Sequence, residues 1–408
     1  MNRNKQILKH YIQRRNKCQR RLRVSQAQAQ ALWQATRKRR GFEDWHEAHK
    51  DESPSAIQVW EEAPLLLGTT KFDPLPGMKN ILITGGSGFI GSWVVRHIAV
   101  TYAGVYKVVN FDKLDYCSST NNTAALDGLP HYSFFQGDVT KVDDVVRCLK
   151  THDIDTILHF AAQSHVDNSF HSPFSFTLNN VCGTHVMLDV ACKFGIKRFI
   201  HVSTDEVYGE AKPEEQGVKE NNVLDPTNPY AASKAAAEMI AKAYWKSFQV
   251  PVIIALTIHG NGSNKRRYIY ATDVADAFDT ILHKGVVGET YNIASRDELS
   301  NVEVAERILA YSSATSGQSQ EKEKGDACKT RIVFVPDRPF NDSRYAVDGS
   351  KLAVLGWKQK VGLEEGLRQT VCWYRQFGER WWERQGGGGE EKNVLPPSPT
   401  PSACCALA

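Results

Sequence analysis

Tyr230 and Lys234 form the residue pair with the clearest chemical use in this sequence. They are four residues apart, so on a helix the phenol and the ammonium share one face. A nearby ammonium favours the phenolate and lowers the pKa of the tyrosine toward working pH, which makes Tyr230 a candidate general base. The same spacing is common on helix surfaces, so its interpretation depends on the rest of the chain.

A glycine cluster supplies a second chemical feature. An apolar run ends in Gly85-x-x-Gly88-x-x-Gly91, and an apolar, helix-compatible segment follows it. This order predicts a strand, a tight turn and a helix, whose unpaired N–H groups and dipole suit a pyrophosphate. A second strand ends beside Asp112, where a ribose-binding carboxylate belongs. The pattern predicts a dinucleotide site that favours NAD over NADP; the alternative is a glycine-rich turn without a ligand.

Strands and helices alternate from residue 79 onward, which predicts an α/β fold with a parallel sheet covered on both faces. We expect a Rossmann-type, doubly wound sheet with a smaller C-terminal substrate lobe, and with ligands at the carboxyl ends of the strands. The NAD-binding domain would span 78–255, and the interleaved lobe 256–384. Expected strands are 81–84, 106–111, 133–137, 156–160, 199–202, 250–254, 265–270 and 288–293; expected helices are 93–100, 142–150, 179–194, 230–248, 272–283 and 363–377.

The composition is that of a soluble globular protein: 41% of the 408 residues are hydrophobic and 24% are charged. No apolar run approaches the roughly 20 residues that a membrane span needs. Nine cysteines are scattered without metal-ligand pairs such as CxxC, and no signal peptide precedes them. We therefore expect a reduced, cytoplasmic protein with free thiols and no metal site.

Both ends of the chain differ from the middle. The net charge of +4 is uneven, because residues 1–42 contain thirteen Lys or Arg and no Asp or Glu. Residues 1–77 could be an organelle transit segment, a nucleic-acid-binding arm or a disordered extension; we favour the extension and expect no nucleic-acid partner. A disordered tail is expected at 385–408. The last four residues, from Cys405, fit a prenylation box, although no basic cluster precedes them.

The motifs together resemble one enzyme family. The glycine turn and the Tyr230–Lys234 pair are similar to those of extended short-chain dehydrogenases/reductases, and Thr204-Asp205-Glu206 narrows the resemblance to the nucleotide-sugar 4,6-dehydratases. Residues 159–167 and 226–230 resemble both the dTDP-glucose enzymes and the dehydratase part of UDP-rhamnose synthesis. The resemblance covers about residues 79–384 and does not choose between dTDP-glucose and UDP-glucose.

The resemblance implies a role for each residue of the catalytic set. In this family NAD oxidises C4 of the sugar, which acidifies the C5 proton, and the hydride later returns to C6. Tyr230 would be the C4-hydroxyl base, with Lys234 tuning it and holding the nicotinamide ribose. Thr204 would hydrogen-bond the reacting hydroxyl, with Asp205 as the acid and Glu206 as the base for water loss.

The resemblance also implies contacts to two ligands and to a second subunit. NAD would be contacted by Gly85, Gly88, Phe89, Ile90, Gly91, Asp112, Lys113, Leu114, Asp115, Asp138, Val139, Ala161, Ala162, Ser164, Asn179, Tyr230 and Lys234. The nucleotide sugar would be contacted by Ser164, Thr204, Arg266, Asn301, Arg338 and Asn341. Relatives form homodimers through the helices that match 179–194 and 230–248, so a homodimer is expected.

The sequence departs from the family pattern directly after Ala255. An Arg/Asn-rich turn, an Asn-x-Tyr-Gly-Pro loop, a Pro-Glu-Lys segment and a helix are absent there. We expect the flanking pieces to fuse into one strand or the second to be displaced, leaving the sugar side open and Arg266 unsupported. A truncated form that binds NAD without turnover is therefore an alternative. A nucleotide-sugar epimerase is a further one, disfavoured by the Asp205-Glu206 pair.

Overall fold

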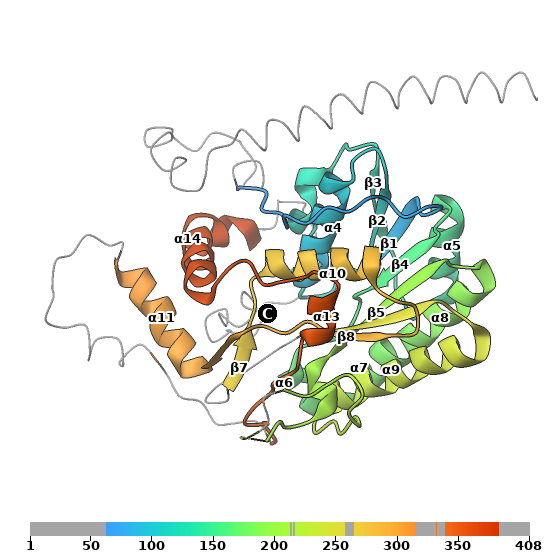
Figure 1. Ribbon diagram of the computed structural model, residues 1–408. Helices are drawn as coiled ribbons and strands as arrows, with labels where there is room; N and C mark the ends of the chain where they lie inside the picture. The colour runs from blue at the N-terminus through green and yellow to red at the C-terminus, as the bar shows by residue number, and fades with distance from the viewer. Residues whose placement is uncertain are drawn as a thin grey trace, which may run out of the picture.

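A seven-stranded, all-parallel sheet forms the centre of the protein in a computed structural model (Figure 1). The structure describes residues 63–212, 214, 217–257, 265–314, 332 and 339–382. The strand order is β3-β2-β1-β4-β5-β6-β8, which is a doubly wound arrangement with one added strand. The strands are β1 (Asn80–Thr84), β2 (Lys107–Asp112), β3 (Tyr132–Gln136), β4 (Thr156–His159), β5 (Arg198–Thr204), β6 (Val252–Thr257) and β8 (Thr290–Asn292).

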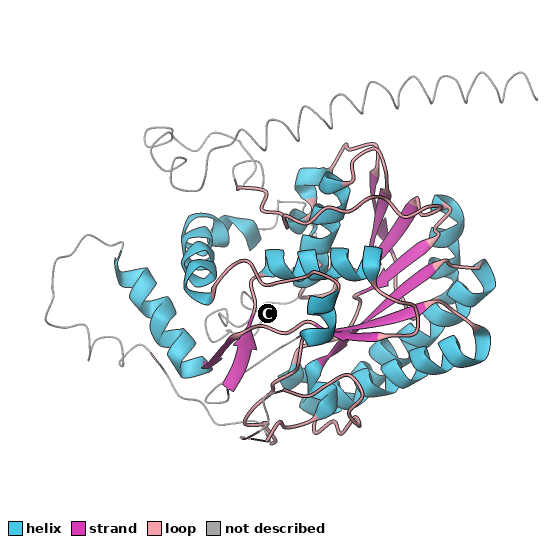
Figure 2. Ribbon diagram, viewed as in Figure 1, coloured by secondary structure: helices cyan, strands magenta, loops and turns pink. Residues whose placement is uncertain are grey.

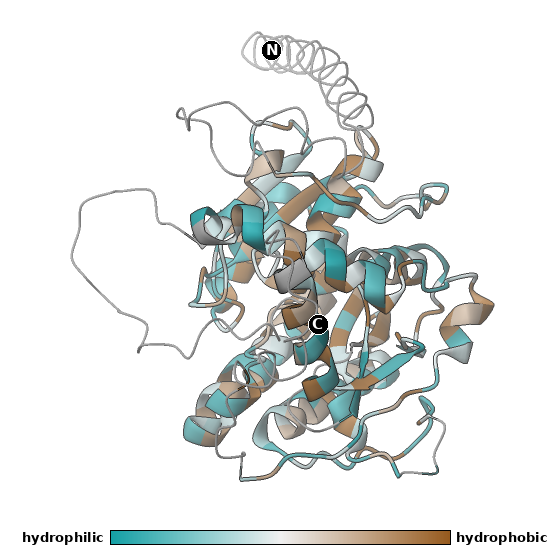
Figure 3. Ribbon diagram, turned by 90° about the vertical axis from the view of Figure 1, so that its left-hand side faces the viewer, coloured by the Kyte–Doolittle hydropathy of each residue, from teal (hydrophilic) through white to brown (hydrophobic). Residues whose placement is uncertain are grey.

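Helices cover both faces of this sheet (Figure 2). Alternation along β1 assigns the faces, because Ile81 and Ile83 pack in one core cluster and Leu82 packs in another. The first cluster contains residues of α4 (Phe89–Thr101) and α10 (Ala271–Lys284); the second contains residues of α5 (Val142–His152), α8 (Gly183–Phe194) and α9 (Pro229–Phe248). Both faces of the strands are therefore apolar, while the helices carry hydrophobic and hydrophilic residues (Figure 3).

The expected α/β architecture is confirmed, with two local differences. A π-helical turn, η3 (Thr177–Cys182), precedes α8 where one continuous helix was expected. Strand β6 continues through Ala255, and its pairing with β5 runs unbroken from Phe199↔Val252 to Thr204↔Thr257. Leu256 and Thr257, which follow the junction, therefore continue the strand, in line with the first of the two expected outcomes, whereas residues 258–264 lie outside the described residues and the chain from Lys265 belongs to a separate two-stranded sheet.

The C-terminal part of the chain contributes to the sheet and also forms a smaller group of elements. Helix α10 packs against α4, and β8 extends the sheet beside β6. Strand β7 (Lys265–Tyr268) pairs antiparallel with β9 (Asp297–Ser300), and α11 (Asn301–Ala314), α13 (Ser350–Val354) and α14 (Leu363–Trp382) complete this part (Figure 1). In the ranges that the structure describes, every helix is too short or too polar to cross a membrane.

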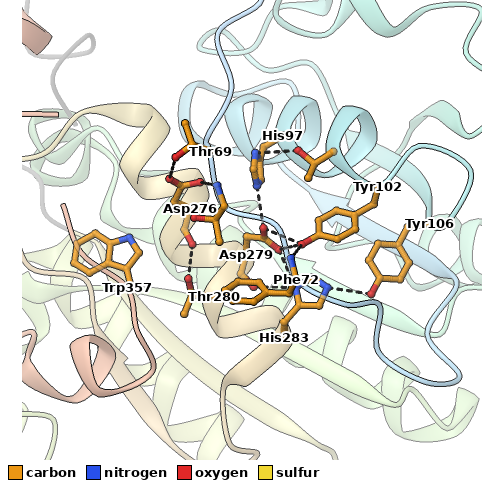
Figure 4. Close-up of polar contacts among 12 residues, drawn as sticks. Thr69, Phe72, His97, Tyr102, Tyr106, Asp276, Asp279, Thr280, His283 and Trp357 are labelled. Carbon is orange, nitrogen blue, oxygen red and sulfur yellow. Dashed lines mark hydrogen bonds and ion pairs between the residues drawn. The ribbon is translucent and has the colours of Figure 1, made fainter. Parts of the chain in front are cut away.

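Residues 63–77, which we call the strap, cross α4 and α10 (Figure 4). Backbone N–H groups of Phe72 and Leu75 donate to the hydroxyls of Tyr102 and Tyr106, each over 2.9 Å. The N–H of Thr70 donates to Asp276 Oδ1 over 2.8 Å. Strap leucines at 65, 67 and 75 pack against the first core cluster. The expectation that the whole of 1–77 lies outside the fold is therefore wrong for 63–77, whose main-chain groups are bonded to buried side chains.

The strap lies over a buried polar cluster centred on Asp279 (Figure 4). This carboxylate is fully buried and receives hydrogen bonds from His97 Nε2 at 3.0 Å and the Tyr102 hydroxyl at 2.9 Å, and it lies 2.8 Å from His283 Nδ1. Burial alone would raise the pKa of Asp279, but the hydrogen bonds from His283 and His97 hold it below its usual value. A buried carboxylate needs such partners, because leaving it unpaired would cost several kcal/mol.

We predict that a chain starting at residue 78 melts about 5–10 °C below one starting at residue 63, because it loses three backbone hydrogen bonds and the burial of the leucines. Differential scanning calorimetry of the two chains measures this. Gly68→Ala in the longer chain is a matched test of docking, since its Cβ would lie 2.2 Å from Asp276 Oδ1. Equal melting temperatures for all three chains would show that the strap adds nothing to stability.

Candidate active site

The glycine turn joins β1 to α4 and brings three chain segments into close contact. Gly85 has φ +69°, and a Cβ on it would lie 2.8 Å from the backbone of Ala161 at the end of β4. A Cβ on Gly91 would lie 2.2 Å from the Gly85 carbonyl oxygen. Only glycine allows this packing. Phe89 and Ile90 follow in the first turn of α4. The N–H groups of a first helical turn lack partners within the helix, so they suit an anion.

Asp112 lies at the end of β2, next to this turn. Its Oδ2 accepts from the Ser87 N–H at 3.1 Å and its Oδ1 from the Leu114 N–H at 2.8 Å, which fixes the carboxylate beside the glycines. Leu114 has φ +60°, a conformation that a leucine rarely adopts, so the loop is held in an unusual shape. This placement is the one that a carboxylate contacting a ribose requires.

Other predicted cofactor residues gather along the same edge of the sheet. Lys113 Nζ lies 2.9 Å from Asp115 and donates to Asn179 over 3.2 Å, so it connects the β2 loop to the π-helical turn. The Ala161 N–H donates to Thr84 Oγ1 over 3.2 Å, which places Ala161 and Ala162 beside the end of β1. The structure also places Asp138 and Val139 directly after β3, with Asp138 accepting from Thr140, and it leaves Ser164 exposed in the loop after β4.

Helix α9 carries Tyr230 and Lys234 into the interior at the end of β5. Lys234 Nζ donates to the Val202 carbonyl over 2.5 Å, and Tyr230 hydrogen-bonds Thr204. Burial lowers the pKa of Lys234 to about 8. Burial and the nearby Glu206 carboxylate raise the pKa of Tyr230. This direction is opposite to the one expected from the Tyr–Lys spacing, because the ammonium is bound to β5 and burial is the larger effect.

Asp205 and Glu206 occupy a 3₁₀ turn, η4 (Asp205–Tyr208), directly after β5. They are 1% and 3% exposed, so they do not form a solvated pair on a surface loop. Burial, and then the charge of Glu206, raise the pKa of Asp205 well above its usual value. Asp205 therefore holds its proton more strongly than an ordinary carboxyl group does, while Glu206 accepts a hydrogen bond from Asn228 Nδ2 at 2.8 Å. Two carboxyl groups with different environments are what acid–base catalysis requires.

Arg266 of β7 is buried close enough to Asp205 for its charge to oppose the raised pKa of that carboxyl group. Its guanidinium donates to the Asp342 and Lys265 carbonyls over 2.9 Å each and stacks 4.3 Å from the Tyr345 ring centroid. The Tyr345 hydroxyl bonds the Asp342 carboxylate and lies 3.5 Å from Glu206 Oε2. The expectation that Arg266 is unsupported is wrong, because residues 342–345 hold it, and the buried site around it is not the open one expected.

Two of the remaining predicted substrate residues lie near Arg266 in the chain or in the fold, and one lies outside the described residues. Asn301 begins α11 and accepts from the Tyr268 hydroxyl, two residues along β7 from Arg266. Asn341 is half-buried beside Asp342. Arg338 lies outside the described residues, as do Cys405 and the tail.

Sequence reasoning missed three residues of this site. Asn228 was detectable, because an Asn before a Pro at the start of a helix is a typical N-cap. Asp342 and Tyr345 were not, because they are more than a hundred residues from Glu206 and reach it only through the tertiary fold.

Comparisons with known proteins identify similar chains. The family model described as GDP-mannose 4,6 dehydratase matches residues 82–259 and 255–370, so the match breaks at the Ala255 junction. A trifunctional UDP-glucose 4,6-dehydratase/UDP-4-keto-6-deoxy-D-glucose 3,5-epimerase/UDP-4-keto-L-rhamnose-reductase of Arabidopsis thaliana is 43% identical over 348 residues, 78% of this chain. The chain spans 50% of that relative's length. The dTDP-D-glucose 4,6-dehydratase of Mus musculus is 40% identical over 331 residues, 74% of this chain and 90% of the relative.

Solved structures show the same similarity. A dTDP-glucose 4,6-dehydratase from Streptomyces venezuelae, crystallised with NAD bound, superposes with a TM-score of 0.67 and 33% identity over 74% of this chain and 99% of its own. A Thermus thermophilus UDP-glucose 4-epimerase in complex with NAD gives a TM-score of 0.63 and 25% identity over 72% of this chain and 99% of its own.

Proposed function

This chain belongs to the GDP-mannose 4,6 dehydratase family of nucleotide-sugar dehydratases, and we propose that it binds NAD and dehydrates an NDP-glucose to the NDP-4-keto-6-deoxyglucose. The observation that carries the proposal is the buried Asp205–Glu206 pair beside Tyr230 and Lys234 at the end of β5. The pair favours a dehydratase over a nucleotide-sugar 4-epimerase. Relatives named for UDP-glucose and for dTDP-glucose have similar identities, so either is a candidate substrate, on a route to deoxysugars such as rhamnose.

The residues present fit NAD. The first turn of α4 offers backbone N–H groups that suit a pyrophosphate, and Asp112 lies where it would accept from ribose hydroxyls. When bound, NAD would supply the hydride acceptor for the oxidation at C4 and the hydride donor for the reduction at C6. Lys234 would hold the nicotinamide ribose, and Ala161 and Ala162 would line the space beside it.

The chain's own residues would then move the protons. Burial raises the pKa of Tyr230, so its phenol proton would have to pass to solvent before the phenolate could accept the proton of the C4 hydroxyl. Glu206 would take the C5 proton once C4 is a ketone. Asp205, whose raised pKa favours the protonated form, would give its proton to the departing C6 hydroxyl, so that water leaves. The proton taken by Glu206 balances the one given by Asp205 over the elimination.

We also propose a homodimer formed through α7 (Pro173–Phe176), η3 and α9. These neighbouring elements expose large apolar side chains, with Phe174 76%, Phe248 60% and Met239 47% exposed. Large apolar side chains exposed on neighbouring elements are typical of an interface. A cytosolic location is part of the proposal, because every cysteine in the described residues is a free thiol.

We predict that Tyr230→Phe abolishes C4 oxidation while NAD remains bound, because only the proton acceptor is lost. Glu206→Gln should oxidise C4 and then stall before water loss, so that reduced-nicotinamide absorbance accumulates. Stopped-flow absorbance with dTDP-glucose and UDP-glucose, beside measured NAD content, tests both. General base catalysis is worth about 10²–10⁴-fold in rate. If the turnover of either variant stays within about twofold of wild type, the role assigned to that residue is wrong.

We predict that inserting the segment found between the two matched pieces in the mouse relative, after Ala255, raises turnover about tenfold or more. The added loop and helix would let Arg266 and Tyr345 move apart from the carboxyl groups and admit a sugar in the correct orientation. NAD content should not change, because Gly85–Gly91 and Asp112 precede the junction. The same insertion with Glu206→Gln is the control, and equal turnover with and without the segment would refute the prediction.

We predict that Met239→Asp or Phe174→Asp shifts the protein from dimer to monomer in sedimentation velocity at micromolar concentration. A buried carboxylate in an apolar interface costs several kcal/mol. Val354→Asp is the matched control, because Val354 is 86% exposed on α13, outside the proposed interface elements. A wild-type chain that sediments as a monomer would overturn the proposal directly.

A further inference from the structure

We propose that Asn228 is a positioning residue that sets the location of Glu206 relative to Tyr230. It precedes α9 by one residue and is itself buried. One amide group joins two elements that come from different parts of the site: the turn after β5 and the start of the helix that carries Tyr230. The inference rests on the proposed function for its catalytic meaning, but its structural part can be tested without any substrate.

The two ends of the Asn228 side chain have different partners at short distances. Its Oδ1 accepts from the Ala231 N–H at 2.8 Å, which caps α9. Its Nδ2 donates to Glu206 Oε2, also at 2.8 Å. The amide orientation follows from these partners, because the reversed amide would place an oxygen against a carboxylate and an N–H group against an N–H group. The residue therefore fixes both contacts at once.

The contact directs Glu206 in a crowded site. Tyr345 reaches the same oxygen only at 3.5 Å and bonds the Asp342 carboxylate as well, so Asn228 makes the shorter contact to Glu206. In the proposed reaction, Tyr230 acts at C4 and Glu206 at the adjacent C5. Two groups that act on neighbouring carbons must keep a fixed separation, because a misplacement of about 1 Å can cost about 10²-fold in rate. Asn228 supplies that constraint by binding both elements.

Two substitutions separate this role from simple helix capping. Asn228→Asp and Asn228→Ser both keep an oxygen that can cap α9, and Asp caps helices as well as Asn does. A capping role alone therefore predicts that Asn228→Asp is neutral or stabilising, since a negative charge suits a helix N-terminus. The positioning role predicts the opposite, because Asn228→Asp places a second carboxylate against Glu206.

The test is the melting temperature of the full chain between about pH 5 and pH 8. Two carboxylates in contact share a proton at low pH, so their pKa in the folded state is raised and stability falls as the pH rises. We expect Asn228→Asp to lose roughly 3–6 °C relative to wild type across this range, and Asn228→Ser to show no such slope. Asp205, Tyr230 and Tyr345 also face Glu206, and Arg266 and Asp342 contact Tyr345; all five are unchanged in every variant.

A double variant supplies the control. Adding Glu206→Gln to Asn228→Asp removes the charge pair and should abolish the pH slope. With a nucleotide sugar, Asn228→Ser should accumulate reduced nicotinamide as Glu206→Gln does, with turnover lowered about 10–100-fold while KM stays within about twofold. If the melting temperature of Asn228→Asp equals that of the wild-type chain at every pH, the proposal is wrong. Absence of turnover in the wild-type chain would instead refute the proposed function and leave the melting comparison valid.

Discussion

The close approach of the β1–α4 turn to the end of β4 is the constraint on which the cofactor side of this protein depends. Gly85 touches the Ala161 backbone, and Gly91 packs on Gly85. Any side chain at these positions would separate β1, α4 and β4. The first turn of α4 would then move away from Asp112, whose carboxylate is tied to Ser87 in the same turn. A local steric requirement thus determines the relative positions of two strands and a helix.

The pKa values of the proposed catalytic residues depend on their burial. The interior raises the pKa of Asp205, lowers that of Lys234 and raises that of Tyr230, and all three directions follow mainly from loss of water. Glu206 affects two of these groups through its charge. The contacts made by Asn228 and Arg266 therefore matter beyond their own energies, because moving one carboxylate changes the protonation of its neighbours.

Much of this arrangement could be predicted from the sequence because the determinants are local. The glycine spacing, Asp112 at the end of a strand and Tyr230 at the start of a helix each depend on a short segment. The direction of the Tyr230 pKa shift could not be predicted, because it depends on burial and on Glu206, which lies in the turn after β5. Two other features could not be predicted either: the contacts of Arg266 with Asp342 and Tyr345, and the docking of the strap. In both cases the partners are distant in the chain.

The strap has a consequence for the order in which the chain becomes structured. Thr70 and Asp276 are 206 residues apart, and Tyr102 and Asp279 are 177 residues apart. During synthesis, the strap leaves the ribosome long before α10 exists. Its N–H groups therefore have no buried acceptor cluster to bind until most of the chain has been translated. Closing contacts of such sequence separation is slow, so the first described segment of the protein is among the last to reach its place.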